Sequence, residues 1–223
     1  DRDRYEEALE NYMKSVELGR NDTWIYSEIA WTYFLLGKST EALEYMNKAK
    51  ELSPVEVDPL LVSRTSSILV ALGKHTEAIK ILEEIMSKEE YKDNIGILSD
   101  LAYIYDDLED YKNGLIYLKR ANELGRDDIW INVEIGMCYA KLEEYEKAIE
   151  NYLVAYEIDR EDILTLTELG WVYDAMEKYE DAIEFLLKAE KLGRDDEWLN
   201  TEIGLNLGRS GKQKKELKDY KNL

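Results

Sequence analysis

One stretch of 34 residues, 129–162, contains the pattern that decides the fold: IWINVEIGMCYAKLEEYEKAIENYLVAYEIDRED. In it a small residue, Gly136, follows an aliphatic residue and precedes Tyr139 by three positions. Twelve residues after Gly136 comes a second small residue, Ala148, and Tyr152 follows four positions later. Apolar residues separated by three and four positions lie on one face of an α-helix. The stretch therefore predicts two amphipathic helices joined by a short break.

The same pattern recurs along the chain with separations of 34, 36, 36, 34 and 34 residues between copies. The second small residue of each copy stands at Ala8, Ala42, Ala78, Gly114, Ala148 and Ala182. The first small residue stands at Ala30, Ser66, Ala102, Gly136, Gly170 and Gly204. The breaks fall at Gly37-Lys38, Gly73-Lys74, Glu109-Asp110, Glu143-Glu144 and Glu177-Lys178. Each copy is therefore predicted to be an antiparallel pair of helices, whose small residues let the two backbones approach closely.

A period near 34, a small residue followed three positions later by Tyr, an Ala in the second helix and Pro54 at the end of one unit together resemble tetratricopeptide repeats. The resemblance implies an all-α fold, a right-handed superhelical array of antiparallel helix pairs. We expect a single solenoid over residues 1–223, with a half-repeat at 1–20, repeats at about 23–56, 59–92, 95–128, 129–162 and 163–196, and a last repeat or cap at 197–223. The repeat at about 59–92 departs from the pattern at Thr65, Ser66 and Leu69, so its helices are expected to pair least tightly.

The two ends carry incomplete units. Asp3–Leu18 is predicted to be a second helix without its first, which indicates either a chain cut from a longer protein or a natural half-unit start. Trp198–Arg209 is predicted to be a sixth first helix, and Lys212–Leu223 a separate polar capping helix. The capping helix keeps only Leu217, Tyr220 and Leu223 as apolar contacts. Open repeat stacks need a polar cap for solubility.

Helix boundaries are marked by recurring Asp and Gly residues. Acidic caps precede the first helices at Asn21-Asp22-Thr23, Asp127-Asp128, Glu161-Asp162 and Asp195-Asp196, where carboxylates accept hydrogen bonds from free backbone N–H groups. A Gly-Arg pair recurs at Gly19-Arg20, Gly125-Arg126 and Gly193-Arg194. These pairs lack the Gly pattern and the Lys-Ser/Thr of phosphate-binding loops. Each Gly is therefore predicted to be a helix C-cap in the left-handed region.

The chain of 223 residues has 29 Lys and Arg against 49 Asp and Glu, a formal net charge of −20. Nucleic acid and anionic membrane surfaces are disfavoured as partners, because both are bound by clustered basic residues. A basic or amphipathic protein or peptide is favoured instead. The apolar runs are far shorter than a membrane span, and a single Cys excludes an internal disulfide framework, so we expect a cytoplasmic protein. A composition rich in Lys, Glu, Tyr, Ile and Asn favours a bacterial source.

A second stripe on each first helix is expected to face the concave groove of the stacked helix pairs. Its candidate partner-binding residues are Trp24, Ser27, Trp31, Phe34, Ser99, Tyr103, Trp130, Met137, Thr167, Trp171 and Trp198. Trp and Tyr offer large, rigid contact areas at interfaces. For Trp24, Trp130 and Trp198, packing on the preceding second helix is the alternative interpretation. No stripe position supplies the Lys and Asn with which some members of the family grip a C-terminal carboxylate.

A row of acids lies beside this stripe, at Glu28, Asp100, Glu134, Glu168 and Glu202, with Arg64 as the exception. The row could form an acidic groove that attracts partners bearing Lys or Arg. The alternatives are that repeat duplication copied these residues, or that each acid pairs with a base of a neighbouring unit.

No catalytic, cofactor-binding or metal-binding pattern is present. The only His, His75, is expected to be a solvated turn residue, and Cys138 is expected to pack between helices. One His and one Cys in different units do not form a metal site or a nucleophile pair. The predicted function is a non-enzymatic scaffold or adaptor that binds a peptide or partner helix in its groove. The alternatives are a peptide-sensing regulatory domain of a longer signalling or enzymatic protein, and a homo-oligomer that assembles through its end units.

Overall fold

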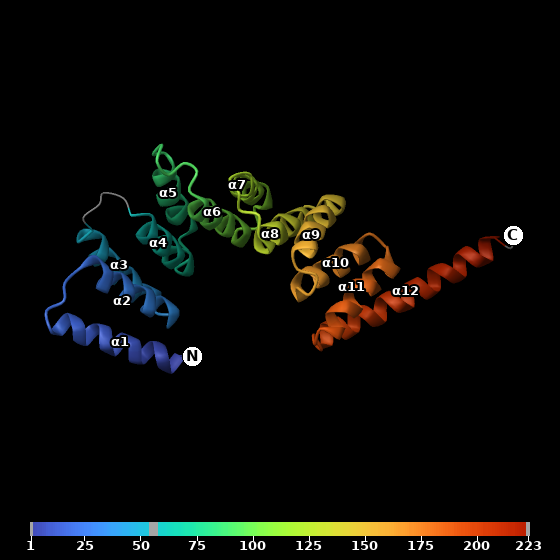
Figure 1. Ribbon diagram of the computed structural model, residues 1–223, viewed down its shortest axis with the longest axis horizontal. Helices are drawn as coiled ribbons and strands as arrows, with labels where there is room; N and C mark the ends of the chain where they lie inside the picture. Colours follow the sequence, from blue (N-terminus) through green and yellow to red (C-terminus); the bar gives the residue numbers. More distant parts are fainter. Residues whose placement is uncertain (1, 54–57, 222–223) are drawn as a thin grey trace. The chain divides into compact units, whose positions relative to one another are not determined.

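The computed structural model describes residues 2–53 and 58–221, and within them it contains twelve α-helices and no strand (Figure 1). The chain divides into two compact units, and the boundary between them lies after Leu124. The first unit contains α1 Arg2–Glu17, α2 Thr23–Leu35, α3 Ser39–Glu51, α4 Pro59–Ala71, α5 His75–Met86, α6 Ile95–Asp107 and α7 Tyr111–Glu123. The second contains α8 Ile129–Lys141, α9 Tyr145–Ile158, α10 Ile163–Ala175, α11 Tyr179–Lys191 and α12 Glu197–Lys221. The predicted all-α repeat fold is thereby confirmed.

The helices pair as the sequence predicts. The most extensive contacts within the first unit join α2 to α3 and α6 to α7, and those within the second join α8 to α9 and α10 to α11. The pair α4 and α5 has the least extensive contact of the five, which confirms the expectation from Thr65, Ser66 and Leu69. Pro54 lies outside the described residues. Among the described residues, no helix combines the length and the apolar character that a membrane crossing requires.

Left-handed residues end the helices. Gly19, Gly125 and Gly193 have φ of 102°, 99° and 98°, which confirms the predicted C-caps. In the turns within the five helix pairs, the residues with positive φ are Gly37, Gly73, Glu109, Glu143 and Glu177. After α8, for example, the N–H of Glu144 donates to the carbonyl of Tyr139 and the N–H of Glu143 donates to that of Ala140. These bonds satisfy carbonyls that would otherwise lack partners and reverse the chain within two residues.

The core of each pair forms where the small residues of the two helices meet. Ala30, Ala42, Met46 and Ala49 are fully buried between α2 and α3. In the second unit, a Cβ built on Gly170 would lie 2.6 Å from the side chain of Leu186, so only glycine permits this approach.

The last helix differs from the prediction. The break expected between Arg209 and Lys212 is absent, because α12 continues from Glu197 to Lys221 without a turn (Figure 1). A separate capping helix is therefore wrong for this structure; the side chains of 212–223, including the apolar contacts expected of Leu217, Tyr220 and Leu223, lie outside the described residues. A single glycine costs a helix only about 1 kcal/mol, and the Lys, Gln and Glu that follow Gly211 favour helix. The face of α12 that carries Gly204 and Leu207, which a following second helix would cover, is correspondingly open. Within the described residues nothing lies within 4 Å of a Cβ built on Gly204, and Leu207 is 56% exposed.

Candidate partner-binding surfaces

A junction of sequence Gly-Arg-x-Asp-x-Trp occurs three times, at 19–24, 125–130 and 193–198, and is built in the same way each time. The Arg guanidinium lies over the Trp ring, at 4.5 Å for Arg20 and Trp24, 4.0 Å for Arg126 and Trp130, and 4.9 Å for Arg194 and Trp198. The Arg also pairs with the Asp, at 2.8, 3.3 and 2.7 Å. The same Asp accepts a hydrogen bond from the N–H three residues later and so caps the helix. The junction thus fixes one Trp at the first turn of α2, α8 and α12.

The first of these tryptophans packs partly on the preceding second helix. Trp24 contacts the ring of Tyr12 on α1 edge-on, with centroids 6.0 Å apart, yet remains half exposed. The packing interpretation of Trp24 is therefore confirmed in part, and partner binding by its exposed part stays a prediction. The cap also lowers the pKa of Asp22, through the backbone N–H of Ile25 and then the hydrogen bond from Arg20.

Arg64 neutralises part of the predicted surface in the first unit. Its Nη1 donates to Glu28 Oε1 at 2.9 Å and to Ser27 Oγ at 2.7 Å. Its guanidinium also lies 5.4 Å from the ring of Trp31, which stacks on Phe34 at 4.7 Å. The ion pair is largely buried, so Glu28 is a structural partner of a neighbouring repeat's base.

Two other predicted residues of the first unit lie one turn apart on α6. Asp100 is half-buried, and burial raises the pKa of its carboxyl against the effect of a hydrogen bond with Ser63. Its Oδ2 is buried without a hydrogen-bond partner among the described residues. Tyr103 is 63% exposed, whereas Ser99 donates its hydroxyl to the carbonyl of Ile95 on its own helix. Tyr103 is thus the most exposed aromatic residue of the predicted stripe.

The second unit contains a pocket of about 480 Å³. Helix α8 contributes Met137, Ala140 and Lys141, α10 contributes Leu164, Thr167, Glu168 and Trp171, and Arg194 and Trp198 complete the wall. Trp171 and Trp198 are 36% and 38% exposed, and Trp171 contacts the ring of Tyr145 edge-on at 6.3 Å. The structure therefore brings together five of the predicted site residues: Met137, Thr167, Glu168, Trp171 and Trp198.

The carboxyl of Glu168 is tied to the helix pair behind it. The hydroxyl of Tyr152 on α9 donates to Glu168 Oε2 at 3.3 Å. Burial raises the pKa of Glu168, while the Tyr152 hydroxyl, Lys141 and Arg194 act in the opposite direction. The burial and the carboxylate together raise the pKa of Tyr152, which stays a neutral donor. Glu168 is thus a half-buried wall residue rather than part of a solvated acidic surface.

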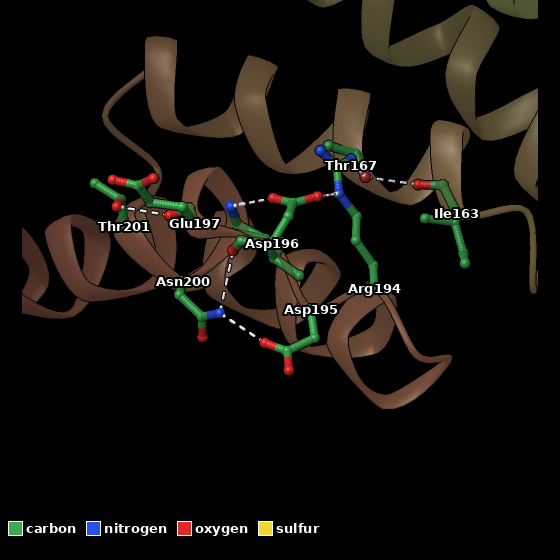
Figure 2. Close-up of polar contacts among 9 residues, drawn as sticks. Ile163, Thr167, Arg194, Asp195, Asp196, Glu197, Asn200 and Thr201 are labelled. Carbon is green, nitrogen blue, oxygen red and sulfur yellow. Dashed lines mark hydrogen bonds and ion pairs between the residues drawn. The ribbon is translucent and has the colours of Figure 1, made fainter.

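Arg194 bridges two helices at the edge of the pocket (Figure 2). Its Nε pairs with Asp196 Oδ2 at 2.7 Å, and its Nη1 donates to Thr167 Oγ1 on α10 at 2.6 Å. Thr167 in turn donates to the carbonyl of Ile163 at 2.6 Å. The guanidinium is therefore held in place by contacts within the chain.

The sequence prediction missed Lys141 and Arg194 as pocket residues. The recurrence of Gly-Arg was a signal for Arg194, but the pattern alone predicts a helix end and not a pocket wall. Of the remaining candidates, Trp130, Glu134 and Glu202 do not line this pocket. Cys138 is buried, as expected. His75 is not simply solvated, because its Nε2 lies 2.6 Å from Asp107 Oδ2 on α6.

The described residues contain no group of three His, Cys, Asp or Glu side chains that could hold a metal ion. The repeats, their left-handed turns and their exposed aromatic residues define a helical-repeat protein, and arrays of this class present extended binding surfaces.

Comparison with known proteins agrees with that class. Two family models, each described as "Tetratricopeptide repeat", match residues 127–195, and 25–56 with 95–128. The chain belongs to the tetratricopeptide repeat family.

Sequence identity to individual proteins is low. The Protein CTR9 homolog of Arabidopsis thaliana is 28% identical over 111 residues, which is 50% of this chain and 10% of that protein. MamA 41-end from Desulfovibrio magneticus RS-1 superposes with a TM-score of 0.67 at 20% identity, covering 78% of this chain and 97% of that one. YrrB, described as "a TPR protein with an unusual peptide-binding site", gives 0.61 at 25% identity, with coverage of 86% and 96%.

Proposed function

We propose that this chain is a protein-interaction scaffold or adaptor that binds a peptide or partner helix on the first-helix surfaces of its repeats. The observation that supports this most is the pocket of the second unit, where Trp171 and Trp198 stand partly exposed beside Met137 and Leu164. Partly exposed Trp residues in a concave, mainly apolar site are typical anchors of protein interfaces. YrrB, which shares the fold at 25% identity, is described as having a peptide-binding site.

The first unit is proposed to contribute a second contact region. Tyr103 on α6 and Trp24 on α2 are its most exposed aromatic residues in the predicted stripe. Trp31 contributes less in this proposal, since Arg64 and Phe34 already cover its ring. Glu28 also contributes little steering charge, because Arg64 neutralises it.

Selection from a phage library of random 12-residue peptides tests the proposal directly. Selected peptides are titrated against the full chain by isothermal calorimetry. Trp171→Ala is expected to weaken their binding at least tenfold, because it removes the largest apolar surface on the α10 side of the pocket. Leu187→Ala, which truncates an exposed residue on the second helix α11, is the matched control and should leave the Kd unchanged.

Combined replacement of Trp31, Tyr103 and Trp171 by Ala extends the test to both units. The triple variant is expected to lose peptide binding while keeping its helical circular dichroism. Selected peptides that bind the triple variant and the parent equally would refute a role for the first-helix surfaces. A library that yields no binder at micromolar affinity would refute peptide binding itself.

A further inference from the structure

Two cations border the pocket of the second unit, and they come from different elements. Lys141 is the last residue of α8, and Arg194 lies in the segment between α11 and α12. Lys141 is exposed and forms no hydrogen bond or ion pair within the part of the chain that the structure describes. Its ammonium group therefore has all three donors available to a ligand.

Arg194 has one nitrogen left for a ligand. Nε is bonded to Asp196 and Nη1 to Thr167, while Nη2 has no hydrogen-bond partner among the residues described. The face of the guanidinium rests on Trp198. A planar group held at three places loses little freedom when it binds a further acceptor. Arg194 thus presents a pre-organised donor at the pocket edge. Figure 2 shows the polar contacts with Asp196 and Thr167 that hold it.

The acid of the pocket does not cancel these donors. Glu168 Oε2 is already occupied by the Tyr152 hydroxyl. The remaining oxygen, Oε1, is the one carboxylate acceptor among the lining residues, against the two donor groups at the edge. The free polar groups of the pocket are therefore mainly positive donors.

Apart from Thr167, the rest of the wall is apolar. Met137, Leu164 and Trp171 line the pocket together with the two cations. A pocket of about 480 Å³ is large enough for one or two bulky side chains of a peptide. The site thus combines an apolar interior with cationic donors at its edge.

We infer that this pocket binds an acidic-apolar peptide segment, in which a bulky apolar side chain enters between Met137, Leu164 and Trp171 and an adjoining carboxylate is bound by Lys141 and Arg194. The inference rests on the proposed function and specifies its ligand in the second unit. It reverses the charge class expected from the acid row, because Glu168 is a half-buried wall residue. The net charge of −20 opposes an acidic partner only weakly, since physiological salt screens the exposed charges that lie more than about 8 Å from the bound peptide.

Three synthetic peptides that differ in charge alone test this inference. The host is Ser-Gly-Ser-Glu-Phe-Leu-Glu-Ser-Gly with blocked ends, and the two comparison peptides carry Gln or Lys in place of both Glu residues. Each is titrated against the full chain at pH 7.5 and 0.15 M NaCl, and binding is followed by tryptophan fluorescence and calorimetry. The Glu peptide is expected to bind at least tenfold more tightly than the Gln peptide, and the Lys peptide more weakly than either.

Variants then assign the effect to the pocket. Lys141→Met should weaken the Glu peptide about tenfold while leaving the Gln peptide unchanged, because the apolar stem remains. Lys191→Met is the matched control, since it removes the same charge from the last turn of α11, away from the pocket; it should change neither affinity.

The inference is overturned if the Glu and Gln peptides bind equally, if the Lys peptide binds most tightly, or if none of the three binds. None of these results decides the proposed function, which the library selection tests separately. Library peptides that depend on Trp171 but carry Lys or Arg would keep the interaction module and reject the acidic ligand.

Discussion

Gly136 on α8 lies directly against the ring of Tyr152 on α9: a Cβ built on this glycine would be 2.5 Å from Cε1 of the tyrosine. Tyr152 is completely buried, and its hydroxyl donates to Glu168 in the pocket. The absence of a side chain at Gly136 therefore leaves room for the ring that carries this hydroxyl. The core of one helix pair is thus linked by a hydrogen bond to a carboxyl on the neighbouring first helix.

Gly136→Ala is expected to destabilise the protein by about 1–3 kcal/mol, because the added methyl group must displace a buried ring. Gly204→Ala is the matched control on α12. Nothing described lies within 4 Å of its added Cβ, so the better helix propensity of Ala should raise stability by up to about 1 kcal/mol. Urea unfolding followed by circular dichroism measures both, and equal effects of the two variants would contradict the close approach.

Glu168→Gln is expected to remove a pH-dependent loss of stability. Burial raises the pKa of Glu168 in the folded state, so between the ordinary Glu pKa of about 4.3 and the raised value the folded protein binds more protons than the unfolded one. Stability therefore falls as pH rises through this window, and Gln, which does not titrate, removes that fall. The free energy of unfolding of the variant should thus gain on the parent from pH 4.5 towards neutral. A difference that is constant with pH would refute the raised pKa.

Replacing the turn residue Glu143 by glycine should stabilise the protein. Its φ of 61° lies in the left-handed region, which is strained for residues with a Cβ. Glu143→Gly is expected to raise stability by up to about 1 kcal/mol. Glu146→Gly, three residues later in the first turn of α9, should instead lower stability by up to about 1 kcal/mol, because it removes an acid from the positive end of the helix dipole and replaces it with a poor helix former. Thermal unfolding of the pair checks the opposite signs.

Removing the Arg64 guanidinium should cost more than removing an exposed one. Arg64→Met leaves Glu28 and Ser27 without their donor in a largely buried place, at an expected cost of about 1–3 kcal/mol. Arg2→Met breaks the exposed pair with Glu6 and is expected to change stability by less than about 1 kcal/mol. A double-mutant cycle with Glu28→Gln isolates the pair, and a coupling near zero would show that the ion pair contributes nothing.

Local rules were sufficient for the fold. A left-handed glycine such as Gly125 is recognisable because it follows a periodic apolar segment and precedes an acidic cap. The small-residue positions were recognisable for a similar reason, since their spacing repeats with the helix pair. The turn expected after Arg209 was wrong, because the repeat period says where a turn can occur and not whether a second helix packs there to stabilise it.

The site was less predictable. Met137 and Trp171 could be placed on one surface from their repeat positions, whereas the roles of Lys141 and Arg194 depend on side chains that meet from three elements. Charge was the least predictable property. Glu28 and Glu168 occupy the same repeat position, yet one is paired with Arg64 and the other is held by Tyr152. Those partners are non-local, so spacing within one repeat does not reveal them.

The uncovered face of α12 at Gly204 and Leu207 has a consequence for how the second unit unfolds. In a repeat array each helix pair is stabilised mainly by its immediate neighbours. Within the described part of this unit, α10 packs extensively on both α9 and α11, whereas the extensive contact of α12 is with α11 alone. The backbone amides of α12 should therefore exchange with deuterium earlier than those of α10, and unzipping should begin at this helix and proceed towards α8.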